Sequence, residues 1–153
     1  MDKRFISENL YKKITDLLPI CCVDLVIRTK NTFLLVKRLD KPYKRMWFFP
    51  GGRILFGESF ETAVKRKLKE ELNIRNFRKI KFLGTGNLKF QKGRFGNPGQ
   101  TITNVFLVEI DKKESSKVRL DRTSSGYKWF DAVRKDFHPY LKKFLTLAGF
   151  KQK

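Results

Sequence analysis

The sequence predicts a single domain of the α/β class, in which a mixed β-sheet is packed between helices as an α/β/α sandwich. Three observations support this prediction. Strand-like segments lie both before and after one amphipathic helix at 59–72, and another helix-like segment lies near the C-terminus. The 153 residues are 41% hydrophobic and 14% aromatic, which is enough for one core and excludes a disordered chain. We therefore expect residues 1–153 to form one domain.

The first half of the chain contains one helix and two long strands by its pattern. Apolar residues recur at helical spacing from Ile6 to Leu17, and Pro19 ends this helix. Asn31 marks a turn between two runs that are rich in β-branched and aromatic residues. In order, the expected elements are a helix at 5–17, strands at 20–29 and 32–38, a polar loop at 40–45, a short aromatic segment at 46–49 and a turn at 50–52.

The second half is predicted from the same signals. Five glycine, asparagine and proline residues within 91–100 indicate a loop between two strands. After the helix at 59–72, the expected elements are a strand at 80–90, the loop at 91–100, a strand at 101–110, a charged loop at 112–117, a short strand at 126–130 and a helix at 139–148. The helices at 5–17 and 139–148 flank the domain.

The formal net charge of +20 is the most unusual global feature of the chain. Such a charge favours polyanionic partners, namely nucleotides, RNA or a membrane surface. The basic residues are spread along the whole chain, however, which is also typical of a lysine-rich host proteome. No signal-peptide pattern and no apolar run of membrane-spanning length occurs, so we expect a cytoplasmic protein that does not enter a membrane. Cys21 and Cys22 are adjacent and are the only cysteines, which excludes a disulfide framework and a zinc site.

The helix at 59–72 carries charged residues on the face that should pack. Ser59 is suited to cap its N-terminus, and its apolar arc consists of Phe60, Ala63, Val64, Leu68 and Leu72. Lys67 and Glu71 fall inside this arc, where an unpaired charge is costly. Two interpretations remain open, an i,i+4 ion pair and a site for a metal ion.

The spacing of the surrounding residues resembles the Nudix box. From Gly52, five residues lead to Glu58 and seven more lead to Arg66, and Glu70, Glu71 and Ile74 follow over 52–74. Two positions differ: Lys67 stands where the family has its first helical glutamate, and Asn73 stands where it has glycine. Asparagine tolerates a left-handed helix end, whereas Lys67 replaces a potential metal ligand with a cation.

The resemblance implies a metal-dependent hydrolase that cleaves nucleoside diphosphate derivatives on a Nudix-type sandwich. Mg²⁺ or Mn²⁺ would be held by hard oxygen ligands and would neutralise charge on the phosphates. By the family pattern, the metal ligands are Gly51, Glu70 and Glu71. Glu58, Arg66 and Glu70 would act in catalysis.

Within the family, the chain is most similar to the GDP-mannose mannosyl hydrolase branch. The shared residues include Val23 to Leu25, Phe33 to Leu35, Lys37 with Arg38 and, above all, Trp47 to Arg53. The resemblance implies that Asp24, Arg38, Arg53 and Phe5 contact the substrate. Arg38 and Arg53 would also act in catalysis, Arg38 by stabilising charge on the departing diphosphate.

The similarity to this branch ends at the loop that should carry the catalytic base. Thr123 and Ser124 stand where the branch has glutamine and histidine, although Tyr127 to Trp129 matches the strand that follows. Neither hydroxyl is a useful base near neutral pH without an activating partner. His138, the only histidine, is expected to cap the last helix, so we predict that Asp121 activates the water instead.

Three functions therefore remain open from the sequence. The favoured one is hydrolysis of a nucleotide sugar such as GDP-mannose. The alternatives are hydrolysis of a (d)NTP or dinucleotide, and a catalytically impaired protein that binds nucleotides or RNA through its basic charge. A homodimer is compatible with each of them.

Overall fold

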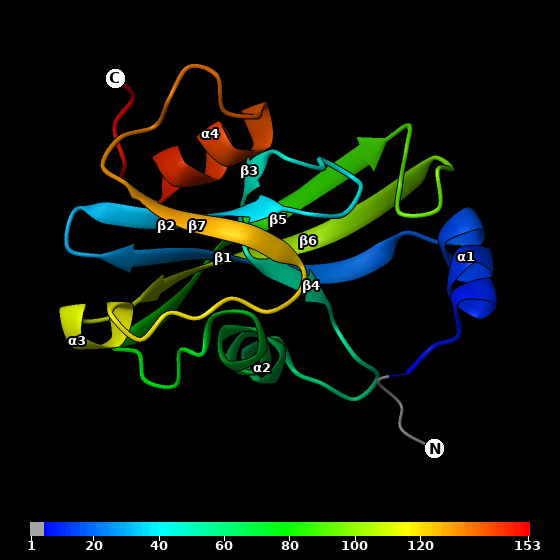
Figure 1. Ribbon diagram of the computed structural model, residues 1–153, viewed down its shortest axis with the longest axis horizontal. Coiled ribbons are helices and arrows are strands. Elements are labelled where there is room, and N and C mark those ends of the chain that lie inside the picture. The colour runs from blue at the N-terminus through cyan, green and yellow to red at the C-terminus, as the bar shows by residue number, and fades with distance from the viewer. Residues whose placement is uncertain (1–4) are drawn as a thin grey trace.

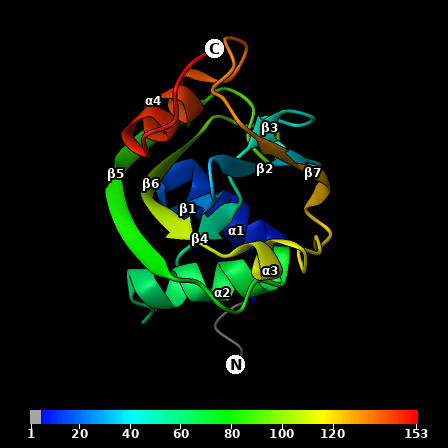
Figure 2. The ribbon, with the colours of Figure 1, turned by 90° about the vertical axis from the view of Figure 1, so that its left-hand side faces the viewer.

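A computed structural model describes residues 5–153, and it confirms the predicted sandwich (Figure 1). Seven strands form one sheet, and helices α2 and α4 cover its two faces, as Figures 1 and 2 both show. The helices are α1 (Glu8–Leu17), α2 (Phe60–Leu72), α3 (Lys112–Ser115) and α4 (Pro139–Leu147). The strands are β1 (Ile20–Thr29), β2 (Thr32–Arg38), β3 (Trp47–Phe48), β4 (Gly51–Arg53), β5 (Lys79–Phe90), β6 (Gly99–Glu109) and β7 (Ser124–Phe130).

The sheet is mixed because β1 pairs with strands of both directions. It runs parallel to β6 over Ile20–Arg28 and antiparallel to β2 and β4. Strand β2 also pairs with β3 and β7, and β5 pairs antiparallel with β6 along its length. As a result, β1 places its side chains at the centre of the sheet, where α2 packs on one side and α4 on the other.

Two hydrophobic clusters form the core, one on each face of the sheet. The cluster under α2 includes Val23, Leu25, Ile27, Leu34, Val64, Leu68 and Leu72. The cluster under α4 includes Val26, Phe33, Leu35, Phe130, Leu141, Phe144 and Leu145. Successive residues of β1 alternate between the two clusters, because side chains of a strand point to opposite faces. Cys21 is exposed and Cys22 is buried for the same reason, and both thiols are free.

Strand β4 is a correction to the sequence analysis, which predicted only a turn at 50–52. Gly51 and Gly52 lie beside Asp24 and Val23 in an antiparallel pair with β1. A Cβ atom at Gly51 would collide with the carbonyl of Val23 and the carboxylate of Asp24. Glycine is therefore required here by the close approach of two backbones, which propensity for turns does not reveal.

The ends of α2 agree with the prediction. The hydroxyl of Ser59 accepts a hydrogen bond from the amide of Thr62 at 3.1 Å, which caps the helix start. Asn73 ends the helix in a left-handed conformation with a φ of 58°. The predicted loop at 112–117, in contrast, contains the short helix α3, because the Asp111 side chain caps it by accepting from the amide of Glu114 at 2.8 Å. No helix within residues 5–153 is long and apolar enough to cross a membrane.

Glu114 on α3 fixes the chain that leaves α2. Its buried carboxylate accepts hydrogen bonds from the backbone amides of Arg75 at 2.8 Å and Asn76 at 3.2 Å. These bonds lower the pKa of Glu114 to about 2. The ammonium of Lys117 is 3.0 Å from the other oxygen.

We expect Glu114→Ala to lower the free energy of unfolding by about 3 kcal/mol, because it leaves two backbone amides without acceptors. Urea unfolding at neutral pH measures this change. Glu61→Ala is the matched control, since Glu61 is 65% exposed and its ion pair with Lys65 lies at the surface. An equal loss in both variants would contradict this role of Glu114.

Candidate active site

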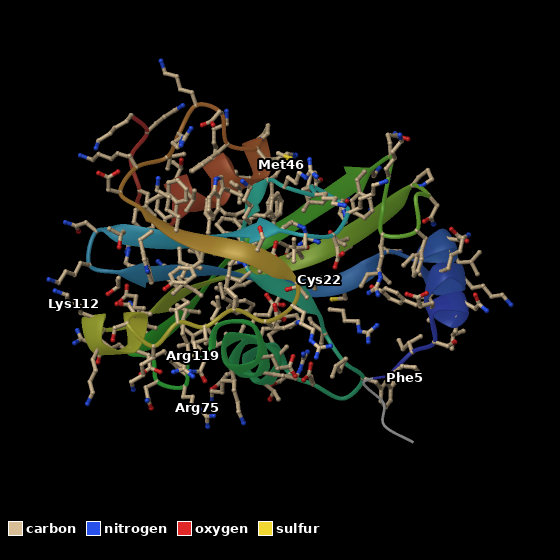
Figure 3. The ribbon with its side chains drawn as sticks, viewed as in Figure 1. Phe5, Cys22, Met46, Arg75, Lys112 and Arg119 are labelled. Carbon is tan, nitrogen blue, oxygen red and sulfur yellow. The ribbon has the colours of Figure 1, made fainter. Side chains whose placement is uncertain are left out.

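A cavity of about 290 Å³ lies at the side of the sheet where β1, β2, β4 and α2 meet. Asp24 and Arg38 line it from the strands, and Lys67 and Glu71 line it from α2. Tyr11 of α1 and Phe95 of the β5–β6 loop line its outer part. In Figure 3, the label of Cys22, another lining residue, marks its place near the centre of the molecule.

Glu71 is buried at the cavity wall, with two partners that hold its carboxylate in place. The backbone amide of Gly51 donates to Oε2 at 3.1 Å, and the ammonium of Lys67 donates to Oε1 at 2.8 Å. Burial raises the pKa of Glu71, while the charge of Lys67 opposes this rise. The i,i+4 ion pair of the sequence analysis is therefore present, and it lies in the cavity rather than on an outer face of the helix.

A second pair, Glu58 with Arg66, connects the loop before α2 to the helix. Arg66 donates to both oxygens of Glu58, at 2.6 and 2.9 Å, and to the carbonyl of Arg53 at 3.0 Å. It also reaches Glu70 Oε2 at 3.1 Å. The hydrogen bonds that Glu58 accepts from Arg66 lower the pKa of Glu58. Neither Glu58 nor Glu70 is among the residues that line the cavity, so this pair supports the site by positioning the backbone at Arg53.

Asp24 of β1 lies beside Gly51 of β4. It contacts Tyr140, a residue that the sequence analysis missed. The hydroxyl of Tyr140, a residue of α4, donates to Asp24 Oδ2 at 2.8 Å. Burial raises the pKa of Asp24 to about 7, although Tyr140 and the charge of Arg38 oppose this rise. No sequence signal connects positions 24 and 140, since the contact depends on how α4 packs.

The other expected substrate contacts occupy the outer part of the site. The guanidinium of Arg53 lies over the ring of Tyr11 at 5.0 Å, and Tyr11 meets Phe95 edge to face at 5.9 Å. The Nε of Arg38 donates to the carbonyl of Pro42 at 2.8 Å. Phe5 is 73% exposed and does not line the cavity; it lines a neighbouring depression, which shares Tyr11 and Arg53 with the cavity.

The loop before β7 supplies hydroxyl groups to the cavity. Thr123 and Ser124 line it, whereas Asp121 does not, because its Oδ1 accepts from the amide and the hydroxyl of Thr123 at 2.9 and 2.6 Å. The charge of Asp121 nevertheless acts on Glu71 and raises its pKa. His138 caps α4 as predicted, with Nδ1 accepting from the amide of Tyr140 at 3.1 Å.

The donor set near Glu71 fits one divalent cation only in part. Residues 5–153 contain no group of three or more His, Cys, Asp or Glu side chains arranged to hold a metal. Glu71 offers a hard oxygen at the cavity wall. Glu70 immediately precedes it in the helix and has both of its ion pairs on one oxygen, Oε2. These ligands suit a single ion that completes its coordination with substrate phosphate oxygens, as Mg²⁺ commonly does.

Comparison with known proteins assigns the chain to a family. A sequence model of the NUDIX domain matches residues 20–146, which contain β1, the helix α2 and the cavity-lining residues named above except Tyr11. The chain belongs to the Nudix family.

Two curated relatives and one solved structure illustrate its place in the Nudix family. An ADP-ribose pyrophosphatase from Methanocaldococcus jannaschii is 32% identical over 114 residues, 71% of this chain and 62% of that protein. The chain thus matches less than two thirds of that relative's length. The low-salt glycan biosynthesis protein Agl8 from Haloferax volcanii is 27% identical over 142 residues, 92% of this chain and 88% of that protein. The NUDIX domain of Shewanella oneidensis NrtR, solved with ADP ribose, has a TM-score of 0.59 and 25% identity, over 82% of this chain and 83% of that chain.

Proposed function

We propose that this protein is a Nudix hydrolase of nucleoside diphosphates linked to a sugar, with ADP-ribose and GDP-mannose as representatives. One observation carries the proposal: Glu71 is held in a cavity between the Gly51 amide and Lys67, with Asp24 and Arg38 lining the same cavity. A relative named as an ADP-ribose pyrophosphatase and another named for glycan biosynthesis support a substrate with a sugar. Within this substrate class, we propose GDP-mannose on the basis of the sequence similarity to the GDP-mannose mannosyl hydrolase branch.

The residues of the site divide into three roles. Glu71, with Glu70 and the Gly51 backbone, would hold Mg²⁺ or Mn²⁺, which supplies charge neutralisation at the phosphates when bound. Arg38 and Arg53 would pair with the diphosphate, because a guanidinium matches phosphate geometry. Glu58 and Arg66 would position the loop that carries Arg53.

We further propose that water attacks phosphorus rather than the sugar carbon. Attack at carbon requires a base within hydrogen-bond reach of the water. The chain's single histidine is engaged in capping α4, and Thr123 and Ser124 occupy the loop position of the related branch. In the proposed step, the water oxygen bonds to phosphorus, the bond to the bridging oxygen breaks, and a proton passes to a carboxylate or to solvent. We predict that Asp121 is the carboxylate that accepts this proton.

A screen of substrates tests the proposal. Purified protein is incubated with nucleotide sugars, ADP-ribose, dinucleotides and (d)NTPs, each with Mg²⁺ and with Mn²⁺, and the products are separated by chromatography. We expect turnover of at least one nucleoside diphosphate sugar at a higher kcat/KM than that of any (d)NTP or dinucleotide. Turnover of (d)NTPs alone would contradict the proposed substrate class.

A binding protein for nucleotides or RNA is the second candidate. It is favoured by the ammonium of Lys67 on Glu71 and by the net charge of +20, which is not confined to the cavity. Arg75, Lys112 and Arg119, for example, lie near α3 at the end of the molecule away from Phe5 (Figure 3). No turnover of any compound in the screen, together with tight RNA binding that weakens steeply with salt, would favour this candidate.

A further inference from the structure

Lys67 is the feature of this site that neither the motif nor the proposed mechanism uses. The side chains of Lys67 and Glu71 line the cavity, whereas Glu58, Arg66 and Glu70 do not line it. A cation therefore takes one of the two helix positions that face the space for substrate. Its side chain is 17% exposed, so the charge lies where solvent screens it weakly.

The position of Lys67 against β4 is defined by Gly52. A Cβ atom at Gly52 would lie 2.5 Å from Cε and 2.8 Å from Nζ of Lys67. The ammonium thus rests against the backbone of the Gly51–Gly52 strand, in space that a larger residue at position 52 would fill. It is fixed there by Glu71 Oε1 at 2.8 Å and lies 3.9 Å from Glu70 Oε2.

The ion pairs of α2 disfavour two divalent ions held by protein side chains alone. Glu58 is neutralised by Arg66, and Glu71 by Lys67. A second ion, placed beside the one that Glu71 would hold, would meet both that ion and the ammonium at close range, and like charges repel there. The same ammonium has three N–H donors, and only one of them is needed by Glu71.

We propose that the Lys67 ammonium binds the diphosphate of the substrate directly and takes the place of one divalent cation. This inference rests on the proposed function for the identity of the ligand, a nucleoside diphosphate. The donors on Lys67 that Glu71 leaves available turn toward a phosphate oxygen, while Glu71 keeps the ammonium at the Gly52 backbone. The site then needs at most one divalent ion, which the phosphates help to coordinate.

Binding of ADP in excess EDTA tests the direct contact without any metal or turnover. Isothermal titration calorimetry is expected to show ADP binding to the wild type, and Lys67→Met is expected to weaken it by about tenfold or more, as loss of a charge-assisted hydrogen bond requires. Lys67→Arg, which keeps the charge, is expected to lose less. Lys65→Met is the matched control, because Lys65 pairs with Glu61 at 2.6 Å on the exposed side of the same helix.

Manganese titration, followed by electron paramagnetic resonance, tests whether the Lys67 ammonium takes the place of one divalent ion. Without nucleotide, the wild type is expected to bind no more than one Mn²⁺, and Lys67→Glu is expected to bind one more. Wild-type ADP binding in EDTA that is absent, or that Lys67→Met leaves unchanged, would overturn the proposal, and so would two tight Mn²⁺ sites in the nucleotide-free wild type. Loss of ADP binding in Lys67→Met, with no hydrolysis in the screen, would refute the proposed function while supporting this contact.

Discussion

Glu71→Gln is expected to lower kcat by at least about 100-fold with a nucleoside diphosphate sugar as substrate. The carboxylate is buried, offers hard oxygen atoms to the cavity and accepts a hydrogen bond from the Gly51 amide. An amide keeps the size of the side chain and can still accept a hydrogen bond from Lys67, but it removes the negative charge that attracts a divalent ion. The same variant should therefore bind Mn²⁺ more weakly by a similar factor.

Steady-state kinetics and Mn²⁺ titration of the same protein samples measure these two effects. Glu61→Gln is the control, since Glu61 lies on the first turn of α2 with its side chain 65% exposed. It should change neither kcat nor Mn²⁺ affinity. Full turnover by Glu71→Gln would show that the metal site lies elsewhere.

Asp24→Asn is expected to stabilise the protein above pH 7 relative to the wild type. The pKa of Asp24 is about 7 in the folded protein, against an ordinary value of 3.8. Between these values, the folded protein holds a proton that the unfolded chain releases, so this group's contribution to stability falls as pH rises from about 4 to about 7. The full effect is at most about 4 kcal/mol, at about 1.4 kcal/mol per pKa unit.

Urea unfolding of both proteins at pH 5 and pH 8 measures this contribution. Because the pKa of Glu71 is also raised, the comparison uses the difference between variant and wild type at each pH. That difference should favour Asp24→Asn at pH 8 more than at pH 5. Asparagine can keep the hydrogen bond with Tyr140. A difference that is the same at pH 5 and pH 8 would mean that Asp24 is already ionised in the folded protein at pH 5.

Much of the fold could be predicted because local patterns and long-range packing agree. The bounds of β1 and β2 match the prediction, and α2 begins and ends where its Ser59 cap and Asn73 indicate. Strand β4 and helix α3 could not be predicted in this way. The first depends on backbone pairing with β1, and the second on a single cap at Asp111 in a charged segment.

In the candidate site too, contacts within one helix could be predicted from the sequence, whereas contacts between distant elements could not. The i,i+4 spacing alone predicts that Lys67 and Glu71 lie together on one helix, and they do. Contacts between distant elements had no signal in the sequence, and the examples are Tyr140 with Asp24 and Tyr11 with Arg53. A helical wheel also cannot tell which charged residues of α2 face a cavity, because that depends on the strands opposite the helix.

Cleavage in ¹⁸O-labelled water tests whether the protein hydrolyses nucleoside diphosphate sugars by attack of water at phosphorus. ADP-ribose and GDP-mannose are each incubated with the wild type and Mg²⁺ in labelled water, with Glu71→Gln in parallel, and the products are analysed by mass spectrometry. We expect the wild type to form products that carry the label in a phosphate group, and Glu71→Gln to form almost none in the same time. Label in the sugar would contradict attack at phosphorus, and binding of both compounds without any labelled product would contradict hydrolysis itself.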